Sequence, residues 1–554
     1  MKPLRSLPLL FLACQPLLAA PQPLRPDITI RRILDTGTGG TSIRIARDPT
    51  DGFLYYLRTS GSIYRIQIAD GVLSTTARVY TAADTGIGAP YGFAFGPEGN
   101  LYITGNETQG TNTVATVRRG ARATPGGDTR VWMNVARTEP YPRSNIFDHL
   151  VNGIAVSPDG DFLFVNSGAR TDHGEEESQG GLFPGVREVP LTAVMFRLPA
   201  DGRDILLEND RDALLAGGYL FAEGLRNSFD PAFSPSGDLF SGENSDDRDD
   251  NEELNWIQEG HHYGFPWRIG TNDTPQRFPG YDPENDRLVN HNYIAYRRGL
   301  FHDDPTYPDP PEVDFTDPVV NLGPDADSFR NPATGAVQDA SDLGIGLATF
   351  TAHRSPLGLV FDREMALGGG LGGGGFILSW TRGDPNGSPA EGPFRDASED
   401  LLHLDLKKAG EVYQLRATRI TGGFNHPIDA EIIGNRIYVL EHGGSGTVWE
   451  VSLPTGPPPP ESLRRGFVNG DAVFDLTDAV AVLFHLFGGL AAGCLDSADA
   501  DDDGRIDVTD AIRLLRYLFL DEPAPAEPFA ACGPDLTADA GGSDLGCADD
   551  AACE

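Results

Sequence analysis

The chain has 554 residues and a formal net charge of −38 at pH 7. This negative charge argues against nucleic acid or an anionic membrane surface as a partner. The length fits one large domain and one small domain, and no segment beyond the N-terminal region reaches the roughly 18 apolar residues of a transmembrane helix.

The first residues, 1–20, have the pattern of a secretory signal peptide. A basic tip with Lys2 and Arg5 precedes a short apolar run that ends in the small residues Ala19 and Ala20. We expect cleavage near Ala20 and a mature protein that is secreted, periplasmic or held at the cell surface. A lipoprotein acylated at Cys14 is the alternative.

A hairpin pattern recurs along residues 27–453. Each copy is a short apolar strand, a turn rich in Pro or Gly, and in most copies a second apolar strand. The copies lie at residues 43–56, 92–103, 153–165, 229–240, 357–361 and 428–439. Their spacing leaves room for one four-stranded blade per copy, so the sequence predicts an all-β six-bladed β-propeller. Seven or eight blades, with a unit that is hard to see, remain open.

A wide gap before the fifth copy holds a segment rich in Pro and Asp, at about residues 270–345. We expect this segment to be a loop insertion. Ligands of propellers bind on the axis, where loops from every blade converge. A functional residue should therefore lie in a loop, at a matching position of its blade.

Two histidines satisfy that condition. His149 follows Asp148 and stands nine residues before the turn that begins at Pro158. Its reference pKa of about 6.5 lets a loop histidine accept a proton at neutral pH, and Asp148 could orient the ring or hold it charged. His353 directly precedes the fifth hairpin.

Three stretches resemble the soluble quinoprotein glucose/sorbosone dehydrogenase family. They are the pair Asp148-His149, the run Gly224-Leu-Arg226-Asn227, and residues 242–267. The resemblance covers most of residues 28–453. It implies a six-bladed propeller that oxidises a sugar or related alcohol, with pyrroloquinoline quinone (PQQ) as hydride acceptor and calcium as Lewis acid. Electrons would leave through a separate acceptor, because the chain has no haem motif.

The resemblance also implies roles for single residues. His149 would be the general base, and Arg226 and Asn227 would contact the cofactor. Calcium would lie near Glu243 and Asp246, although Ser245-Asp246 stand where the family has Gly-Pro. The remaining cations for the PQQ carboxylates would be Arg382 and His426.

One departure from the family keeps two other functions open. The family has an Arg-x-Arg-Asp motif where this chain has His426-Pro-Ile-Asp429, so two cations are missing. The propeller could be a non-catalytic extracellular binding module. It could also be a calcium-dependent hydrolase such as a lactonase, with Glu243, Asn152 and Asp429 as metal ligands.

After a Pro-rich linker at residues 454–464, the chain contains a calcium-loop pattern at residues 499–510. Calcium prefers six to eight oxygen ligands, and this loop alternates them around a glycine, Gly504, that permits a sharp turn. Arg505 would offer its backbone carbonyl. The expected side-chain ligands are Asp499, Asp501, Asp503, Asp507 and Asp510. An apolar helix pattern follows at residues 511–520.

A degenerate copy of this unit precedes it. Its ligands would be Asn469, Asp471, Asp475 and Asp478, before a helical run at residues 479–487. Phe467 and Ala472 stand where the first Asp and the Gly belong, so this copy either binds calcium weakly or is a structural relic. Together the two units resemble a dockerin domain, a small α-helical calcium-binding domain placed at residues 465–554. The resemblance implies a cohesin-like extracellular partner.

Four cysteines, Cys494, Cys532, Cys547 and Cys553, cluster in this C-terminal domain. An even number in a small exported domain predicts two disulfides. Three pairings are possible. We favour Cys494–Cys532 with Cys547–Cys553, because the second bond closes a short local loop.

Overall fold

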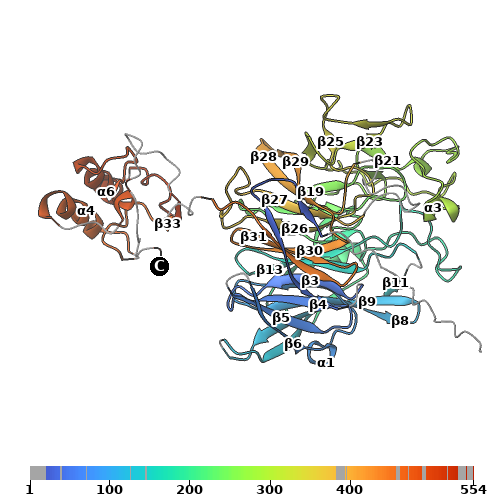
Figure 1. Ribbon diagram of the computed structural model, residues 1–554, viewed down its shortest axis with the longest axis horizontal. Helices are drawn as coiled ribbons and strands as arrows, with labels where there is room; N and C mark the ends of the chain where they lie inside the picture. Colours follow the sequence, from blue (N-terminus) through green and yellow to red (C-terminus); the bar gives the residue numbers. More distant parts are fainter. Residues whose placement is uncertain are drawn as a thin grey trace, which may run out of the picture. The chain divides into compact units, whose positions relative to one another are not determined.

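The computed structural model describes residues 20–37, 40–69, 72–124, 126–143, 146–381, 394, 396–456, 462–471, 473–489, 494–520, 522–534, 545 and 553. The chain divides into two compact units (Figure 1). The first comprises Met1–Arg363 and Gly370–Pro454, and the second comprises Glu364–Gly369 and Thr455–Glu554. The signal-peptide pattern lies almost wholly outside the described residues.

The first unit is an all-β propeller in which each repeated hairpin forms the inner strands of its own sheet. The first strands of these hairpins pack against one another around the ring, as β3 does with both β7 and β30. The hairpins are β3 (Ser42–Arg47) with β4 (Leu54–Arg58), β7 (Pro90–Phe95) with β8 (Leu101–Gln109), β12 (Val151–Val156) with β13 (Phe162–Ser167), β17 (Ala232–Phe233) with β18 (Leu239–Glu243), β26 (Pro356–Phe361) with β27 (Gly375–Ser379), and β30 (Pro427–Ile433) with β31 (Arg436–Glu441).

Outer strands extend five of these sheets to four strands or more. They are β5 (Ile63–Ala69), β6 (Val72–Tyr80), β9 (Asn112–Arg122), β10 (Arg130–Thr138), β14 (Val194–Pro199), β16 (Leu220–Glu223), β28 (Asp400–Ala409), β29 (Val412–Gly422), β32 (Thr447–Ser452) and β2 (Thr29–Asp35). The sheet of β17 and β18 gains only β19 (Glu253–Ile257). The prediction of six four-stranded blades is therefore wrong: the described residues form five. After Ile257 the chain leaves this sheet for the insertion, so the sheet receives no fourth strand.

The insertion contains only short elements, as expected of a loop segment. They are β20 (Arg268–Ile269), β21 (Asn272–Asp273), η1 (Pro275–Arg277), α3 (Ile294–Arg297), β22 (Val320–Asn321), β23 (Ser328–Arg330), β24 (Val337–Asp339) and β25 (Leu347–Ala348). β22 pairs in parallel with β29 and so anchors the insertion to the fifth sheet. Other short elements are β1 (Gln22–Pro23), α1 (Ala82–Thr85), β11 (Tyr141–Pro142), β15 (Ile205–Leu207) and α2 (Arg211–Ala216).

The ring is closed by its N-terminal strand. β2 pairs antiparallel with β32, the third strand of the last hairpin sheet, from Thr29 opposite Ser452 to Asp35 opposite Thr447. Arg31 adds an ion pair to Glu450 at 2.5 Å. Closure by a strand from the other end of the chain removes the free edge that the last blade would otherwise expose.

A buried arginine crosslinks the inner strands. The guanidinium of Arg44 donates to the carbonyls of Tyr91 at 2.8 Å and Phe229 at 2.7 Å. It also lies 3.3 Å from an Asp230 oxygen and 3.9 Å from an Asp429 oxygen. Asp429 further accepts the backbone N–H of Ile45 at 2.7 Å. Asp429 is thereby committed to holding the blades together, which leaves it poorly placed as a ligand of an axial metal.

The second unit is a small helical domain with its own apolar core. Its elements are β33 (Ser462–Leu463), α4 (Leu476–Leu483), η3 (Phe484–Gly488), α5 (Leu495–Ala498), α6 (Val508–Leu520) and β34 (Gly533–Pro534). Val482, Ala498 and Leu514 are fully buried in the core. Within the described residues, no helix of either unit has the length and apolar character needed to cross a membrane.

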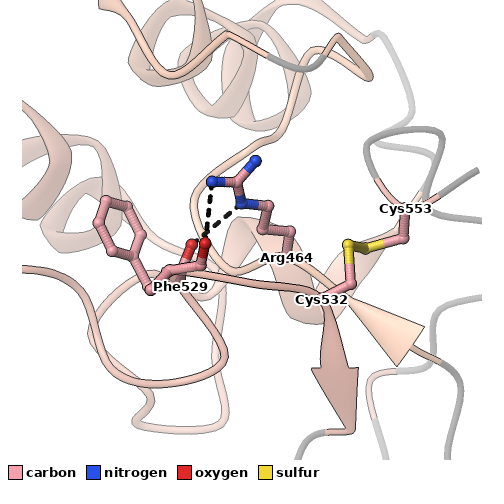
Figure 2. Close-up of a disulfide and its surroundings, with 5 residues drawn as sticks. Arg464, Phe529, Cys532 and Cys553 are labelled. Carbon is pink, nitrogen blue, oxygen red and sulfur yellow. Dashed lines mark hydrogen bonds between the residues drawn. A yellow bond between two sulfur atoms is a disulfide. The ribbon is translucent and has the colours of Figure 1, made fainter. Parts of the chain in front are cut away.

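A disulfide joins Cys532 to Cys553 beside the segment that Arg464 holds (Figure 2). Arg464 donates to the carbonyls of Phe529 and Ala530, both at 3.1 Å. Both favoured pairings, Cys494–Cys532 and Cys547–Cys553, are therefore wrong, because the fold brings Cys532 and Cys553 together across 21 residues. Cys494 is disulfide-bonded as well, and Cys547 lies outside the described residues.

Candidate functional site

One face of the propeller collects the residues singled out in the sequence. The two strands of each inner hairpin are antiparallel, so the segment before the first strand and the segment after the second strand share a face. We call this the loop face. Segments before first strands place His149, Arg226, Asn227, His353 and His426 there, and segments after second strands place Arg58, Asp172, Asp246, Trp380 and His442 there.

His149 is held as a neutral imidazole with one nitrogen available as an acceptor. Its Nδ1–H donates to the Ala169 carbonyl at 3.0 Å, which leaves Nε2 without the proton. Burial of the ring, and then the positive charge of Arg226, lower the pKa of His149 to about 3. Ala169 orients the ring, which is the role that the sequence assigned to Asp148. A neutral imidazole held in this way can accept a proton at Nε2.

Arg226 is bound to the protein itself. Its Nε donates to the Asp172 carbonyl and its Nη2 to Asp172 Oδ1, both at 2.8 Å, and its Nη1 donates to the Asn244 carbonyl at 3.1 Å. Burial opposes ionisation of Asp172, but the hydrogen bond from His173 and the charge of Arg226 hold the pKa of Asp172 below its usual value. These contacts form a buried ion pair, and the contact of Arg226 with a cofactor carboxylate stays a prediction.

Asn227 and Glu243 hold the loop that carries Arg226. Glu243 accepts the Arg226 backbone N–H at 2.9 Å and the Ser228 hydroxyl at 2.6 Å. Asn227 accepts from the amide of Asn152 at 2.8 Å. Both oxygens of Glu243 therefore fix the loop that carries Arg226, so Glu243 acts as an anchor and is a poor candidate for a metal ligand.

Besides Glu243, three buried or partly buried carboxyls near this pair have no ion-pair partner among the described residues: Asp246, Asp247 and Glu252. We call them the acidic group. Burial, followed by repulsion from Asp250 and Asp172, raises the pKa of Asp246 well above its usual value. Burial raises the pKa of Glu252 to about 8, and its Oε2 has no hydrogen-bond partner. A bound cation would relieve this repulsion.

The acidic group lies close to further ligand atoms. One atom each of Asp172, His173 and Asp246 lie within 4.8 Å of one another. His173 places Nδ1 2.9 Å from Asp172 Oδ2 and Nε2 3.3 Å from the Leu300 carbonyl, so both nitrogens act as donors. A doubly protonated imidazole cannot ligate a metal. The carboxylates are therefore the ligands that remain, and oxygen ligands favour calcium or magnesium.

His353 forms a second histidine site on this face. Its Nε2 lies 2.8 Å from Asp249 Oδ1, and its ring stands 4.6 Å from the ring of Tyr293. Burial opposes protonation, but the hydrogen bond to Asp249 and the charges of Asp249, Glu252 and Asp247 raise the pKa of His353. The protonated form of His353 is thus favoured next to the acidic group.

The other side of the loop face is basic and aromatic. Trp380 lies 5.0 Å from the ring of His426 and 5.2 Å from that of His442. His442 donates from Nδ1 to the Ser42 carbonyl at 2.9 Å, which leaves Nε2 as its second polar atom. Arg58, at the end of β4, stacks its guanidinium 5.1 Å above the Tyr64 ring. We call Arg58, Trp380, His426 and His442 the basic-aromatic group.

The sequence analysis missed Arg58, Asp172 and His442. Arg58 ends the second strand of its hairpin, and Asp172 and His442 follow theirs, so that position in the repeat is a signal that could have found them. Arg382, the predicted second cofactor cation, lies outside the described residues.

The donor set of the loop face fits a planar anion held against a cation. PQQ, which the family resemblance implies, is planar and carries three carboxylates. The acidic group offers oxygen ligands to a cation, and the basic-aromatic group offers a positive charge and ring surfaces to the anion. Arg226 is less available to such a ligand, because Asp172 and Asn244 accept three of its five N–H donors.

Comparisons with known proteins give structural likeness only. No family model matches the chain, and no curated protein matches it. One similar solved structure is that of a family AA12 carbohydrate-active enzyme from Trichoderma reesei, 14% identical over 79% of this chain and 98% of that one, with a TM-score of 0.48. Another is the PQQ domain of pyranose dehydrogenase from Coprinopsis cinerea, 13% identical over 77% and 96%, at 0.46. A third is PQQ-bound aldose sugar dehydrogenase from Streptomyces coelicolor, 16% identical over 78% and 99%, at 0.43.

The second unit contains the predicted calcium loop in a folded form. One carboxylate oxygen each of Asp499, Asp501 and Asp503 lie within 4.8 Å of one another, and Gly504 adopts φ +78°. Asp510 is buried and accepts backbone N–H groups from Asp501 at 3.2 Å and Asp507 at 2.8 Å. Burial, followed by the nearby charges of Asp501 and Asp499, raises the pKa of Asp510 to about 7.

The first loop differs because of Phe467. Its ring is 3% exposed and packs against Phe474 and Phe529, so the position of the first ligand belongs to the aromatic core. The Asn469 amide donates to Asp471 at 2.9 Å and to the Thr477 hydroxyl at 2.7 Å. Asp475 begins α4 as its N-cap, and Asp478 accepts the Val468 N–H at 2.9 Å. These bonds stabilise the loop without a metal, which favours the structural-relic interpretation.

Removal of calcium should therefore open the second loop and not the first. In 1 mM calcium, a site with a dissociation constant of about 10 μM adds about 2.7 kcal/mol to folding. We expect a calcium chelator, or Asp499→Ala, to expose Arg513 and Arg516 in α6 to trypsin, detected by mass spectrometry of the digested full chain. Asp471→Ala is the matched control and should leave this cleavage unchanged. Equal protection with and without calcium would contradict the site.

Proposed function

We propose that the propeller is a sugar or alcohol oxidoreductase that binds PQQ and calcium on its loop face. The observation that carries the proposal is the meeting of three features on this face. They are a neutral histidine with an open acceptor nitrogen, an acidic group whose carboxyls form no ion pair among the described residues, and a basic-aromatic group. PQQ, when bound, would supply the hydride acceptor.

The residues of the chain have separate tasks in this proposal. His149 accepts the hydroxyl proton of the substrate at Nε2, while the Ala169 carbonyl keeps Nδ1 protonated. Asp246, with Asp172 close by, holds calcium through oxygen atoms. Arg226 keeps the loops of Asp172 and Asn244 in place and favours the neutral form of His149 through its charge.

Titration of the full chain with PQQ in the presence of calcium tests this proposal. We expect micromolar or tighter binding in a calorimeter, and reduction of an artificial electron-accepting dye when sugars or related alcohols are added. Absence of PQQ binding up to about millimolar concentration would overturn it, and ligand binding on the loop face without turnover would then favour the extracellular binding module.

A calcium-dependent hydrolase is the weaker candidate. The acidic group favours it, because side-chain carboxylates can hold calcium without a quinone. The three ligands first considered for it are otherwise engaged: Glu243 with the Arg226 loop, Asp429 with Arg44, and Asn152 with Asn227. Hydrolysis of a lactone with no electron acceptor present would support it.

We further propose that the protein is exported and that the second unit tethers it to a cohesin-like partner. The folded calcium loop supports this part of the proposal. A pull-down with a panel of cohesin modules, with and without calcium, tests it. Retention by none of them in calcium would leave the second unit as a calcium-stabilised domain with another role.

A further inference from the structure

The guanidinium of Arg58 is a cation without an anionic partner. Among the described residues it makes no ion pair, and its Nε is buried with no hydrogen-bond acceptor. The other buried or half-buried arginines of the loop face are engaged: Arg226 with Asp172, and Arg354 with Asp400. An Nε without an acceptor also occurs at Arg354, so the feature that distinguishes Arg58 is its lack of an ion pair. A guanidinium without an ion pair can take a carboxylate from a ligand.

The position of Arg58 is fixed by packing on two sides. The Tyr64 ring lies 5.1 Å below its Cζ. Gly37, which has a positive φ of +128°, also lies against the guanidinium, and a Cβ there would stand 2.5 Å from Arg58 Nη2. Only glycine lets the guanidinium lie against this backbone. A long side chain that is held in this way binds an anion at a lower entropic cost.

His442 and Trp380 reach the same region from the last two blades. The backbone N–H of Gly37 donates to the Ser445 carbonyl at 3.1 Å, and that of Gly40 donates to the His442 carbonyl at 2.6 Å. A Cβ at Gly40 would stand 3.7 Å from His442 Nε2. The loop between β2 and β3 therefore contacts both Arg58 and His442, and the His442 ring contacts Trp380.

We propose that Arg58, with His442, binds a carboxylate of a planar aromatic polycarboxylate that lies against Trp380. Arginine binds a carboxylate through two parallel hydrogen bonds. This cation takes the place of the arginine pair that is missing at His426-Pro-Ile-Asp429. The inference deepens the proposed function, which names PQQ as that ligand, and gives the site its anion-binding residue.

The test measures ligand binding and needs no turnover. Full-length wild type, Arg58→Gln, Arg58→Lys and His442→Gln are titrated with PQQ in calcium, and separately with benzene-1,3,5-tricarboxylate without calcium. Loss of a charge-assisted pair should weaken binding about 10- to 100-fold in Arg58→Gln, with partial recovery in Arg58→Lys and a smaller loss in His442→Gln. Arg78→Gln, on the exposed outer strand of the same blade, is the matched control.

The outcomes separate this inference from the proposed function. Arg58-dependent binding of the tricarboxylate without any binding of PQQ would support the inference and overturn the PQQ proposal. PQQ binding that is equal, within twofold, in wild type and Arg58→Gln would overturn the inference and keep the PQQ proposal. No binding of either ligand by wild type would overturn both. Arg58→Lys keeps the charge, so it tests the same point if Arg58→Gln fails to fold.

Discussion

Replacement of His149 by glutamine should lower kcat for sugar oxidation by about 10²- to 10⁴-fold, the usual contribution of a general base. Glutamine can keep the hydrogen bond to the Ala169 carbonyl but cannot take up a proton. KM should change little, since the structure gives His149 no role in holding the substrate beyond the proton transfer. Steady-state dye reduction over a range of sugar concentrations measures both constants.

The pH profile provides a second readout for His149. Because its pKa is lowered to about 3, the ring is already neutral at pH 5. Activity should therefore lack the inflection near pH 6.5 that an ordinary histidine base would give, and should fall only on strong acidification. His261→Gln is the matched control, since the His261 ring bonds to the Thr316 hydroxyl at 2.9 Å and has no part in the proposed proton transfer. Wild-type activity in His149→Gln would remove the residue from the mechanism.

Replacement of Arg226 by methionine should destabilise the propeller by about 3–5 kcal/mol, because it leaves a buried carboxylate without its partner. Asp172 is fully buried, and the side chain of Arg226 is 7% exposed. Its removal also takes away the positive charge that partly offsets repulsion among Asp246, Asp247 and Asp172. Denaturant unfolding of the full chain, followed by tryptophan fluorescence, measures the change in the midpoint of the propeller transition.

Arg197→Met is the matched control for this measurement. Arg197 makes a two-point ion pair with Glu259 at 2.7 and 2.8 Å, but the side chains are 27% and 60% exposed. Exposed pairs contribute about 0–1 kcal/mol, so this variant should unfold almost as wild type does. If Arg226→Met were as stable as Arg197→Met and lost only PQQ affinity, Arg226 would be a ligand-binding residue and not part of a structural pair.

The sequence predicted the propeller well where the hairpin pattern was local. The apolar strands on each side of the Pro/Gly turns at Pro97 and Pro158 became β7–β8 and β12–β13, because alternation and turn chemistry act over a dozen residues. The number of complete blades was not predictable in this way. The number of complete blades depends on the outer strands. The path of the long irregular insertion after β19 decides whether a fourth strand pairs with β19.

The site was predicted by position more than by role. Sequence placed His149, Arg226, His353 and His426 at equivalent loops, and they do share a face. It could not show that Arg226 pairs with Asp172, 54 residues away, because that contact arises only when two neighbouring blades meet. Phe467 was seen as a missing ligand, and the structure explains it as a core residue. The Cys532–Cys553 bond depends likewise on how the domain packs, which spacing alone does not reveal.

The closure of the ring by β2 has a kinetic consequence. The partner of Arg31 is Glu450, 419 residues later, so β2 cannot take its place until nearly the whole propeller has been synthesised. Pairing over such a sequence separation is slow, and until it happens β32 has an unpaired edge. Blades can form in turn as the chain emerges, but the last step is a single long-range event. In chains that end before Thr447, β2 would have no β32 to pair with. Its exposed edge could then pair with an exposed strand edge of another molecule.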